Sequence, residues 1–459
     1  MVTRQNSIHF LPGVFELMHS VSFVFSLIRY GRTDRSRFIT LSFAILCIVV
    51  PRSAYTQSTP SSNFEEFLGT LETSVEQAAP SMLEKPVAER TKENQFFYAN
   101  PGPWGKLKCF YIYLEPPFEM VEQLPIPHSK IRWSFLPDHA AELPTIFERA
   151  GLPHPMRKRL LDPLNQSVNH ELLNLYPSLA DVEAMEPGMR EVIYPILAKS
   201  ASNEFYKFPI VITADSVEEW YRTSKLPPAF IAKVRKMSYR RSGGIAFSDV
   251  SALLDGLNSE PEARMIIKSL VRTRSLMIQL ELSDEMDIES IVKYWSSDVL
   301  QRRKDIEPIV QSVRDTQGID TLGFVHLLPA LPRKLLYTYP GANYSFHGTL
   351  PDCHWTTFNF FNYDPHEYML DERLVSLYAS EKCVRIEPPY KFGDFVLLQY
   401  PGSEEIIHSC VYLADDMVFT KNGRNWLSPW VIMKLDDVIK YYDSGKGLGI
   451  RACRLKQRS

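Results

Sequence analysis

A recurrence with a period near 75 residues constrains the fold of this 459-residue chain more than any other feature. The pair Leu152-Pro153 occurs again 74 residues later as Leu226-Pro227, and Trp220 is followed 75 residues later by another tryptophan, Trp295. Such recurrence is typical of supersecondary units that stack and bury apolar surface against one another. The sequence therefore predicts a repeat-like, mainly helical region over residues 137–335, with chance similarity among helices as the alternative.

Each repeat is expected to contain a short strand followed by about three helices. Two apolar segments, 208–213 (FPIVIT) and 276–282 (LMIQLEL), have the length and composition of buried strands. Asp215 and Asp284 follow them at the expected helix starts. No nucleotide-binding loop or zinc-binding helix motif occurs in this region, so we expect it to serve as a scaffold or binding part.

The N-terminal segment, residues 1–57, has the features of an export signal. Residues 38–50 (FITLSFAILCIVV) form a 13-residue apolar run behind Arg32, Arg35 and Arg37. The run is shorter than the roughly 20 residues of a membrane-crossing helix, which favours a secretory signal. It begins unusually far from Met1, so the start is in question and a membrane anchor is the alternative.

Charge and cysteine content exclude several classes of protein. The chain carries a formal net charge of −3; residues 1–57 contribute six basic and two acidic side chains, or +4, which leaves −7 for the remainder. This balance offers no general basic field for nucleic acid. The six cysteines include no C-x-x-C pair, so neither a zinc ribbon nor a thioredoxin motif is present. We expect no cofactor and no metal.

Residues 58–136 are predicted to form a linker helix and a small α+β region. A polar stretch at 57–63 precedes apolar residues at helical spacing from Phe64 to Val75. Strand-like apolar segments follow at 107–114 (LKCFYIYL) and 131–136. The overall prediction is an α+β protein with an export segment, this region, the repeat-like middle and a C-terminal domain at 336–459.

The C-terminal domain carries the candidate chemistry. Asp352-Cys353 stands at the predicted start of a helix, where the helix dipole favours a thiolate. A thiol nucleophile needs a nearby base, and His408 begins the apolar strand HSCVYL. We expect His408 to face the cysteine helix across an antiparallel sheet.

These motifs resemble the NlpC/P60 family of papain-like cysteine peptidases. The family has an Asp-Cys pair at a helix start, here Asp352-Cys353, and then a Gly-Asp turn into an apolar strand, here Gly393-Asp394. Its histidine leads a strand that continues to Tyr-Leu, here from His408. The resemblance covers about residues 340–445 and implies a papain-like α+β domain with a helix packed on an antiparallel sheet.

The resemblance implies an exported cysteine hydrolase that cleaves amide bonds, with bacterial cell-wall stem peptides or a protein as substrate. Cys353 would be the nucleophile and His408 the base. The family's third residue, which orients the histidine, falls at Thr420, with Asn422 two residues on. The resemblance also implies that Tyr344 and Asp352 contact the oxyanion or the substrate.

Three alternatives remain open from the sequence. The chain has His354-Trp355-Thr356 where the family has Ser-Gly-Leu. This departure favours a binding or scaffold protein whose papain-like domain has lost its catalytic activity. A cysteine acyltransferase would use the same Cys–His pair with another acceptor. A metal site formed by His347, Cys353, His354 and His408 is the third, although no recognised zinc spacing supports it.

Overall fold

The computed structural model describes residues 9–10 and 96–456, with gaps at 125, 127–129, 170–171, 258, 298–299 and 342–347. The predictions for residues 1–57, for the helix from Phe64 to Val75 and for Tyr344 lie outside the described residues, apart from the short strand β1 (His9–Phe10). No helix within the described ranges has the length and apolar character needed to span a membrane.

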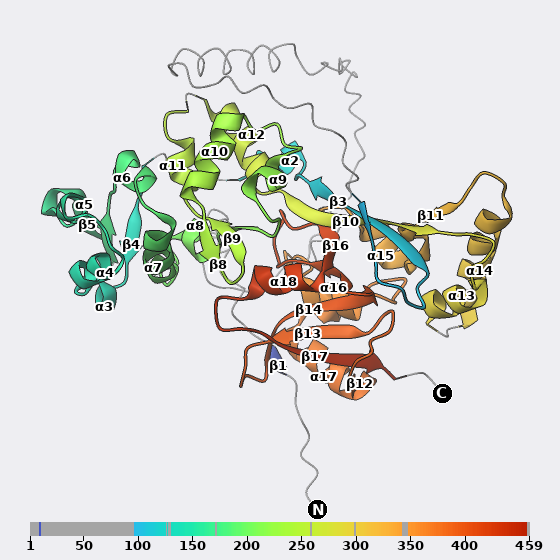
Figure 1. The fold of residues 1–459 in the computed structure, drawn as a ribbon. Helices are drawn as coiled ribbons and strands as arrows, with labels where there is room; N and C mark the ends of the chain where they lie inside the picture. Colours follow the sequence, from blue (N-terminus) through green and yellow to red (C-terminus); the bar gives the residue numbers. More distant parts are fainter. Residues whose placement is uncertain are drawn as a thin grey trace, which may run out of the picture. The chain divides into compact units, whose positions relative to one another are not determined.

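The described chain is a mixed α and β protein built on antiparallel sheets, as the sequence predicts (Figure 1). In the largest sheet the short pair β1–β14 is parallel, whereas the other strand pairs of the four sheets are antiparallel. Three of these sheets lie in residues 96–335 and the largest lies in the C-terminal domain.

Three units between residues 133 and 335 share one order of elements: a leading strand, two or more helices, a strand or hairpin, and two further helices. The first unit contains β4 (Trp133–Phe135), α3 (Pro137–Ala140), α4 (Leu143–Arg149), α5 (His154–Leu160), η3 (Pro163–Asn165), β5 (Gln166–Asn169), β6 (Leu172–Leu175), α6 (Leu179–Glu183) and α7 (Pro187–Leu197). After α8 (Glu204–Lys207), the second contains β7 (Ile210–Ile212), α9 (Val217–Tyr221), α10 (Pro228–Met237), β8 (Tyr239–Arg241), β9 (Gly244–Phe247), α11 (Val250–Leu254) and α12 (Glu260–Leu270). The third contains β10 (Thr273–Glu281), α13 (Ile288–Ser296), α14 (Leu300–Asp315), β11 (Thr321–Gly323), η4 (Phe324–Leu327) and α15 (Ala330–Leu335).

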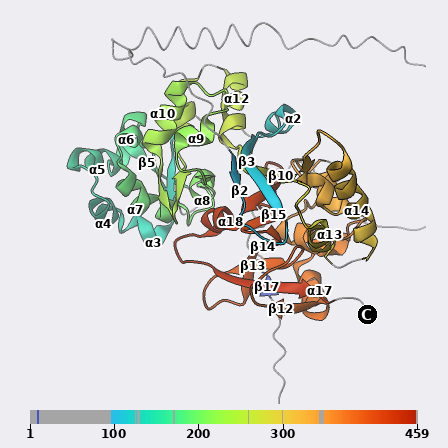
Figure 2. The same cartoon turned by 45° about the vertical axis from the view of Figure 1, so that its right-hand side comes forward.

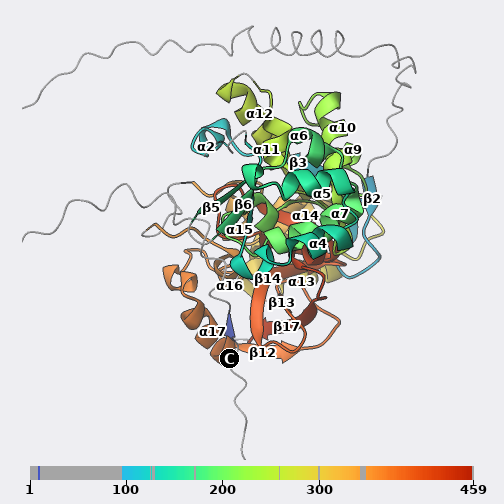
Figure 3. The same cartoon turned by 90° about the vertical axis from the view of Figure 1, so that its left-hand side faces the viewer.

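Residues that recur in the sequence occupy matching places in these units. The two Leu-Pro pairs immediately precede α5 and α10, where a proline at the first turn loses no helical hydrogen bond. The first two units also share one sheet order, β4-β6-β5 and β7-β9-β8, in which the leading strand pairs with the second strand of the hairpin. Figure 3 shows α4, α5 and α7 near the strands of the first unit.

The third unit departs from this pattern because its leading strand is much longer. β10 pairs with β11 and also, over nine residues, with β3 (Lys106–Leu114), from Thr273 opposite Leu114 to Glu281 opposite Lys106. With β2 (Phe96–Tyr98) these strands form a sheet of order β11-β10-β3-β2, in which β3 and β10 run side by side (Figure 2). Helix α2 (Phe118–Val121) follows β3.

The C-terminal domain is a sheet with helices on both faces. Its strands are β12 (Cys383–Ile386), β13 (Phe395–Gln399), β14 (Glu405–Ala414), β15 (Met417–Lys421), β16 (Trp430–Lys434) and β17 (Gly449–Leu455), in the order β12-β17-β13-β14-β15-β16. Its helices are α16 (Cys353–Phe358), η6 (Glu367–Leu370), α17 (Glu372–Lys382) and α18 (Leu435–Tyr442).

Alternation along the strands separates the two faces of this sheet. Val411 and Phe419 belong to the apolar cluster that includes Trp355 and Phe358 of α16. Their neighbours on the strands, including Cys410 and Val418, instead form a cluster with Val438 of α18. The sheet therefore lies between α16 and α18.

The third unit and the C-terminal domain share one hydrophobic core. Leu276 and Trp295 of the third unit belong to the same buried cluster as Trp355 and Ile432 of the C-terminal domain. A separate cluster is formed by buried residues between 121 and 270, among them Trp133 and Trp220. Packing is thus continuous across residue 335, where the sequence suggests a domain boundary.

Strand β16 lies at one end of the C-terminal sheet, and the backbone groups on its outer side form hydrogen bonds with residues outside that sheet. Ser275 Oγ on β10 accepts a hydrogen bond from Ile432 N and donates one to Ile432 O, each at 3.1 Å. Trp430 N donates to Thr338 O at 3.0 Å, and Tyr337 N donates to Trp430 O at 2.8 Å. These contacts join the C-terminal sheet to β10 and to the segment after α15.

Candidate active site

Cys353 is the first residue of α16, and Asp352 caps that helix. Asp352 Oδ1 accepts a hydrogen bond from Trp355 N at 2.9 Å, which satisfies one of the unpaired donors of the first turn. The Asp352 carboxylate also forms an ion pair with Arg424. Burial works to raise the pKa of Asp352, but Arg424 holds it below its usual value. Asp352 therefore acts as a cap and as the partner of Arg424.

The Cys353 thiol is buried and protonated at neutral pH. Only 6% of the residue is exposed. Burial, with a contribution from the Asp352 carboxylate, raises the pKa of the thiol to about 12, although the Ser409 N–H and Arg424 oppose this shift. The prediction that the helix start lowers this pKa is wrong, because loss of solvation outweighs the electrostatic help of a single short helix.

His408 lies on β14 and is fully buried. Its Nε2 makes a 2.9 Å hydrogen bond with Thr420 Oγ1 on β15, and its Nδ1 has no partner among the described residues. Burial, reinforced by His354, lowers the pKa of His408 well below its usual value. If Nε2 carries the proton, Thr420 accepts it in the hydrogen bond and Nδ1 presents a free lone pair.

Of the two candidates for orienting His408, the structure brings Thr420 into contact. Asn422 is also buried, but its Nδ2 lies 3.2 Å from Met433 Sδ, and its Oδ1 has no partner in the described part of the chain. Tyr339, another tyrosine upstream of Cys353, has Glu115 and Arg272 as its charged neighbours.

The ring of His408 lies on the α18 side of the C-terminal sheet, whereas the sequence predicts that it faces α16. Residues two apart on a strand share a face, so His408 lies with Cys410 on the α18 side of the sheet. The body of α16 packs on the other side. The pairing of β14 with β15 stops at Val411 opposite Phe419, and the Cys353 sulfur interacts beyond that point with the N–H of Ser409.

Tyr442, the last residue of α18, completes the cluster around His408. Its ring stacks on the imidazole with centroids 4.1 Å apart and an interplanar angle of 26°. Burial raises the pKa of Tyr442 well above its usual value, and Cys353 is the next contributor. Cys353 likewise contributes to the raised pKa of Cys410. The thiol, the imidazole and the phenol therefore belong to one buried site.

Several polar residues of this site carry no motif in the sequence. His354, whose pKa burial lowers to about 4, makes a 2.9 Å hydrogen bond through Nδ1 with Ser409 Oγ. Lys421 donates to Gly423 O at 2.7 Å and to Asn425 O at 3.0 Å, and burial lowers its pKa to about 7. These residues, with Tyr442 and Arg424, are recruited by tertiary packing, which residue spacing alone does not reveal.

The described residues contain no group of three or more His, Cys, Asp or Glu side chains arranged to hold a metal ion. His347, named in the metal alternative, lies outside the described residues. Among the described groups, the Cys353 thiol and the His408 imidazole are the types of side chain that supply a nucleophile and a base. Comparison of the sequence and structure with protein-family models, curated proteins and solved structures gives no match.

Proposed function

We propose that the chain is a cysteine hydrolase that cleaves amide bonds, with Cys353 as nucleophile and His408 as general base. The observation that carries the proposal is the state of the imidazole. Its Nε2 bonds to Thr420 while its Nδ1 has no partner among the described residues, and its ring stacks on Tyr442, whose raised pKa has a contribution from the Cys353 thiol. A neutral histidine with one nitrogen fixed and the other free is what a general base requires.

The pKa values favour a neutral thiol–imidazole pair over a preformed ion pair. The thiol pKa is raised to about 12 and the pKa of His408 is lowered. Cys353 would therefore lose its proton to His408 Nδ1 during attack on the carbonyl. His408 would then protonate the leaving amine, and water would hydrolyse the thioester with the same base.

The resemblance of residues 340–445 to papain-like peptidases supports peptide amides as the substrate class, and cell-wall stem peptides as the specific proposal. This assignment carries with it an exported location. It also gives the repeat units a supporting role, because they would position the C-terminal domain on a polymer or a partner protein. No cofactor takes part in the proposed reaction.

The test is thiol-selective labelling followed by an assay on peptidoglycan fragments. Iodoacetamide should alkylate Cys353 of the folded full chain in preference to Cys109, Cys383, Cys410 and Cys453, which are also buried. Cys353→Ala should abolish this labelling and the release of peptide fragments. Cys410→Ser is the matched control, because Cys410 shares the site without a proposed chemical role. Equal labelling of wild type and Cys353→Ala would contradict the proposal.

A binding or scaffold protein is the second candidate, and the burial of the site favours it. Cys353 is 6% exposed and His408 is 0% exposed, so a substrate reaches them only if covering side chains move. Under this candidate, wild type binds peptidoglycan fragments without cleaving them, and Cys353→Ala binds equally well. An acyltransferase would differ in product, since it would pass the acyl group to an added amine faster than to water.

A further inference from the structure

The phenol of Tyr442 is a buried hydrogen-bond donor that finds no acceptor in the described part of the chain. Its hydroxyl oxygen has no hydrogen-bond partner among the described residues, although its ring is stacked on His408. Buried polar atoms in folded proteins nearly always have a partner, so each exception calls for an explanation. A tyrosine that served only to cover the imidazole would gain nothing from a buried hydroxyl, and phenylalanine would fill the place.

Two further buried atoms on this side of the sheet also lack a partner among the described residues. They are His408 Nδ1 and Asn422 Oδ1, the latter two residues after Thr420 along the chain. The Tyr442 ring stacks on His408, and the Cys353 thiol contributes to the raised pKa of the phenol, so the phenol, the imidazole and the thiol lie in one buried region. A reacting carbonyl would bring an oxygen that accepts a hydrogen bond, and attack by the thiol would bring the proton that Nδ1 lacks.

We propose that the Tyr442 hydroxyl donates a hydrogen bond to the oxyanion that forms when Cys353 attacks an acyl carbonyl. The inference rests on the proposed function and assigns a third catalytic residue to it. In this step the sulfur–carbon bond forms, the thiol proton moves to His408 Nδ1, and the carbonyl π electrons move onto oxygen. Tyr442 keeps its own proton throughout. When the oxyanion collapses, the bond to the leaving group breaks and the thioester remains on Cys353.

The chemistry of the phenol suits this role. Its raised pKa keeps it protonated at neutral pH, so it remains a donor when negative charge develops beside it. A donor that is already fixed in a buried site stabilises an oxyanion without reorganising at the moment of reaction.

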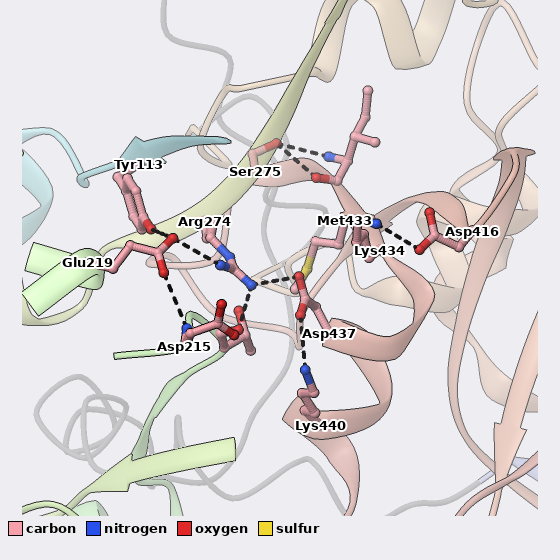
Figure 4. A network of polar contacts seen from close by, with 12 residues as sticks. Tyr113, Asp215, Glu219, Arg274, Ser275, Asp416, Met433, Lys434, Asp437 and Lys440 are labelled. Atoms are coloured by element: carbon pink, nitrogen blue, oxygen red, sulfur yellow. Dashed lines mark hydrogen bonds and ion pairs between the residues drawn. The ribbon is translucent and has the colours of Figure 1, made fainter. Parts of the chain in front are cut away.

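Helix α18, which carries Tyr442, is anchored at its other end by a buried ion pair. Arg274 of β10 donates to Asp437 Oδ2 at 2.9 Å, and the two side chains are 7% and 6% exposed (Figure 4). Lys440 approaches the second Asp437 oxygen at 3.9 Å. Asp437 and Tyr442 lie five residues apart on one helix, so this anchor fixes the place of the phenol relative to β14.

Two reactions of the same thiol separate oxyanion binding from other roles. Acylation of Cys353 by p-nitrophenyl acetate passes through an oxyanion, whereas alkylation by iodoacetamide does not. In the full chain, Tyr442→Phe should slow acylation on the order of 100-fold while alkylation stays within about twofold of wild type. Tyr441→Phe, which removes a hydroxyl from the neighbouring ring, should leave both rates unchanged.

Each outcome decides between the proposals. Equal loss of both rates in Tyr442→Phe would overturn the role of Tyr442, because a packing defect affects both reactions alike. No loss of either rate would also overturn it, because the hydroxyl would then take no part in acylation. The ratio of the rates is independent of the fraction of folded protein, so partial unfolding does not obscure it. If Cys353→Ala reacts with both probes as wild type does, the proposed function itself fails.

Discussion

At the scale of single residues, the contact between His408 and Thr420 decides how the imidazole is presented. The hydroxyl holds Nε2 at 2.9 Å and leaves Nδ1 free. Threonine offers one short hydrogen bond from a side chain with little freedom, because branching at Cβ restricts its rotamers. The orientation of the base therefore depends on one hydroxyl from the neighbouring strand.

We expect Thr420→Val to slow acylation of Cys353 by about fivefold. The substitution keeps the shape of the side chain and removes a hydrogen bond that contributes roughly 1 kcal/mol, and a barrier raised by that amount slows the reaction about fivefold. Thr420→Ser should retain most of the activity because it keeps the hydroxyl. Burst kinetics with p-nitrophenyl acetate measure the effect. Identical rates for the valine and serine variants would show that the hydroxyl has no part in positioning His408.

The raised pKa of the thiol gives alkylation a characteristic pH dependence. Because the pKa of Cys353 is about 12, its thiolate fraction rises about tenfold with each pH unit through the neutral and mildly alkaline range. The rate of iodoacetamide labelling in the folded chain should therefore climb from pH 6 to pH 9 without a plateau. A plateau near pH 6 would indicate a preformed thiolate–imidazolium pair. Cys353→Ala supplies the background rate.

At the scale of elements, helix α18 depends on a partner 163 residues earlier in the chain. Arg274 lies on β10, and its guanidinium stacks over the Tyr111 ring at 4.1 Å while it binds Asp437. Glu219 lies 3.7 Å from the same guanidinium, so the second repeat unit also contributes to this network (Figure 4). The helix that covers His408 is thus positioned by two elements outside the C-terminal domain.

We expect Arg274→Met to lower the free energy of unfolding by about 3–5 kcal/mol. The substitution leaves the Asp437 carboxylate buried without its main partner, which is the costly way to break an internal ion pair. The double variant Arg274→Met with Asp437→Asn should recover part of the loss, because no buried charge then remains. Urea denaturation measures both. Equal stability of the single and double variants would rule out the ion pair as the origin of the effect.

Local elements of the C-terminal domain were accessible from the sequence, whereas the long-range contacts were not. The apolar strand predicted from His408 falls within β14, and the strand predicted after Gly393-Asp394 is β13, since an apolar run depends only on neighbouring residues. Counting from His408 finds Thr420 for the same reason. Tyr442 was missed because its place over His408 depends on the return of α18 to the sheet, and that return has no local signature. The burial of Cys353, which raises its pKa, also arises only from tertiary packing.

At the scale of the whole molecule, buried histidines link stability to pH. The pKa of His354 is lowered to about 4 and that of His408 is lowered well below its usual value, because both are buried as neutral groups. A depressed histidine pKa means that the unfolded chain binds the proton first as pH falls. The stability that these groups contribute is therefore present above about pH 6.5 and is lost as the pH falls toward 4.

We expect the stability advantage of wild type over His354→Gln to shrink by about 2 kcal/mol between pH 7 and pH 5. Glutamine can replace the hydrogen bond to Ser409 and does not titrate. Urea denaturation of both proteins at the two pH values gives the difference, in which the shared carboxylate contributions cancel. Parallel pH profiles for the two proteins would contradict the assignment of a depressed pKa to His354.

The shared core predicts that the C-terminal domain does not fold alone. Leu276, Trp295 and Ile432 belong to one buried cluster, so a fragment of residues 336–459 would expose the surface that packs on β10 and α13. We expect this fragment to lack a cooperative thermal transition, whereas residues 96–459 should retain one. Calorimetry of the two proteins tests this. A cooperative transition in the short fragment would show that residue 335 is a true folding boundary.

The hydrogen bonds along the outer side of β16 also bear on how the molecule behaves in a crowded solution. An end strand with free backbone groups is a template on which another chain can add a strand and begin to aggregate. Here a serine side chain and a short crossing segment occupy the outward groups of Trp430 and Ile432. The sheet is therefore closed to strand addition at that end. A further strand could pair with the sheet only at its other end, along β12, where Val384 is 44% exposed.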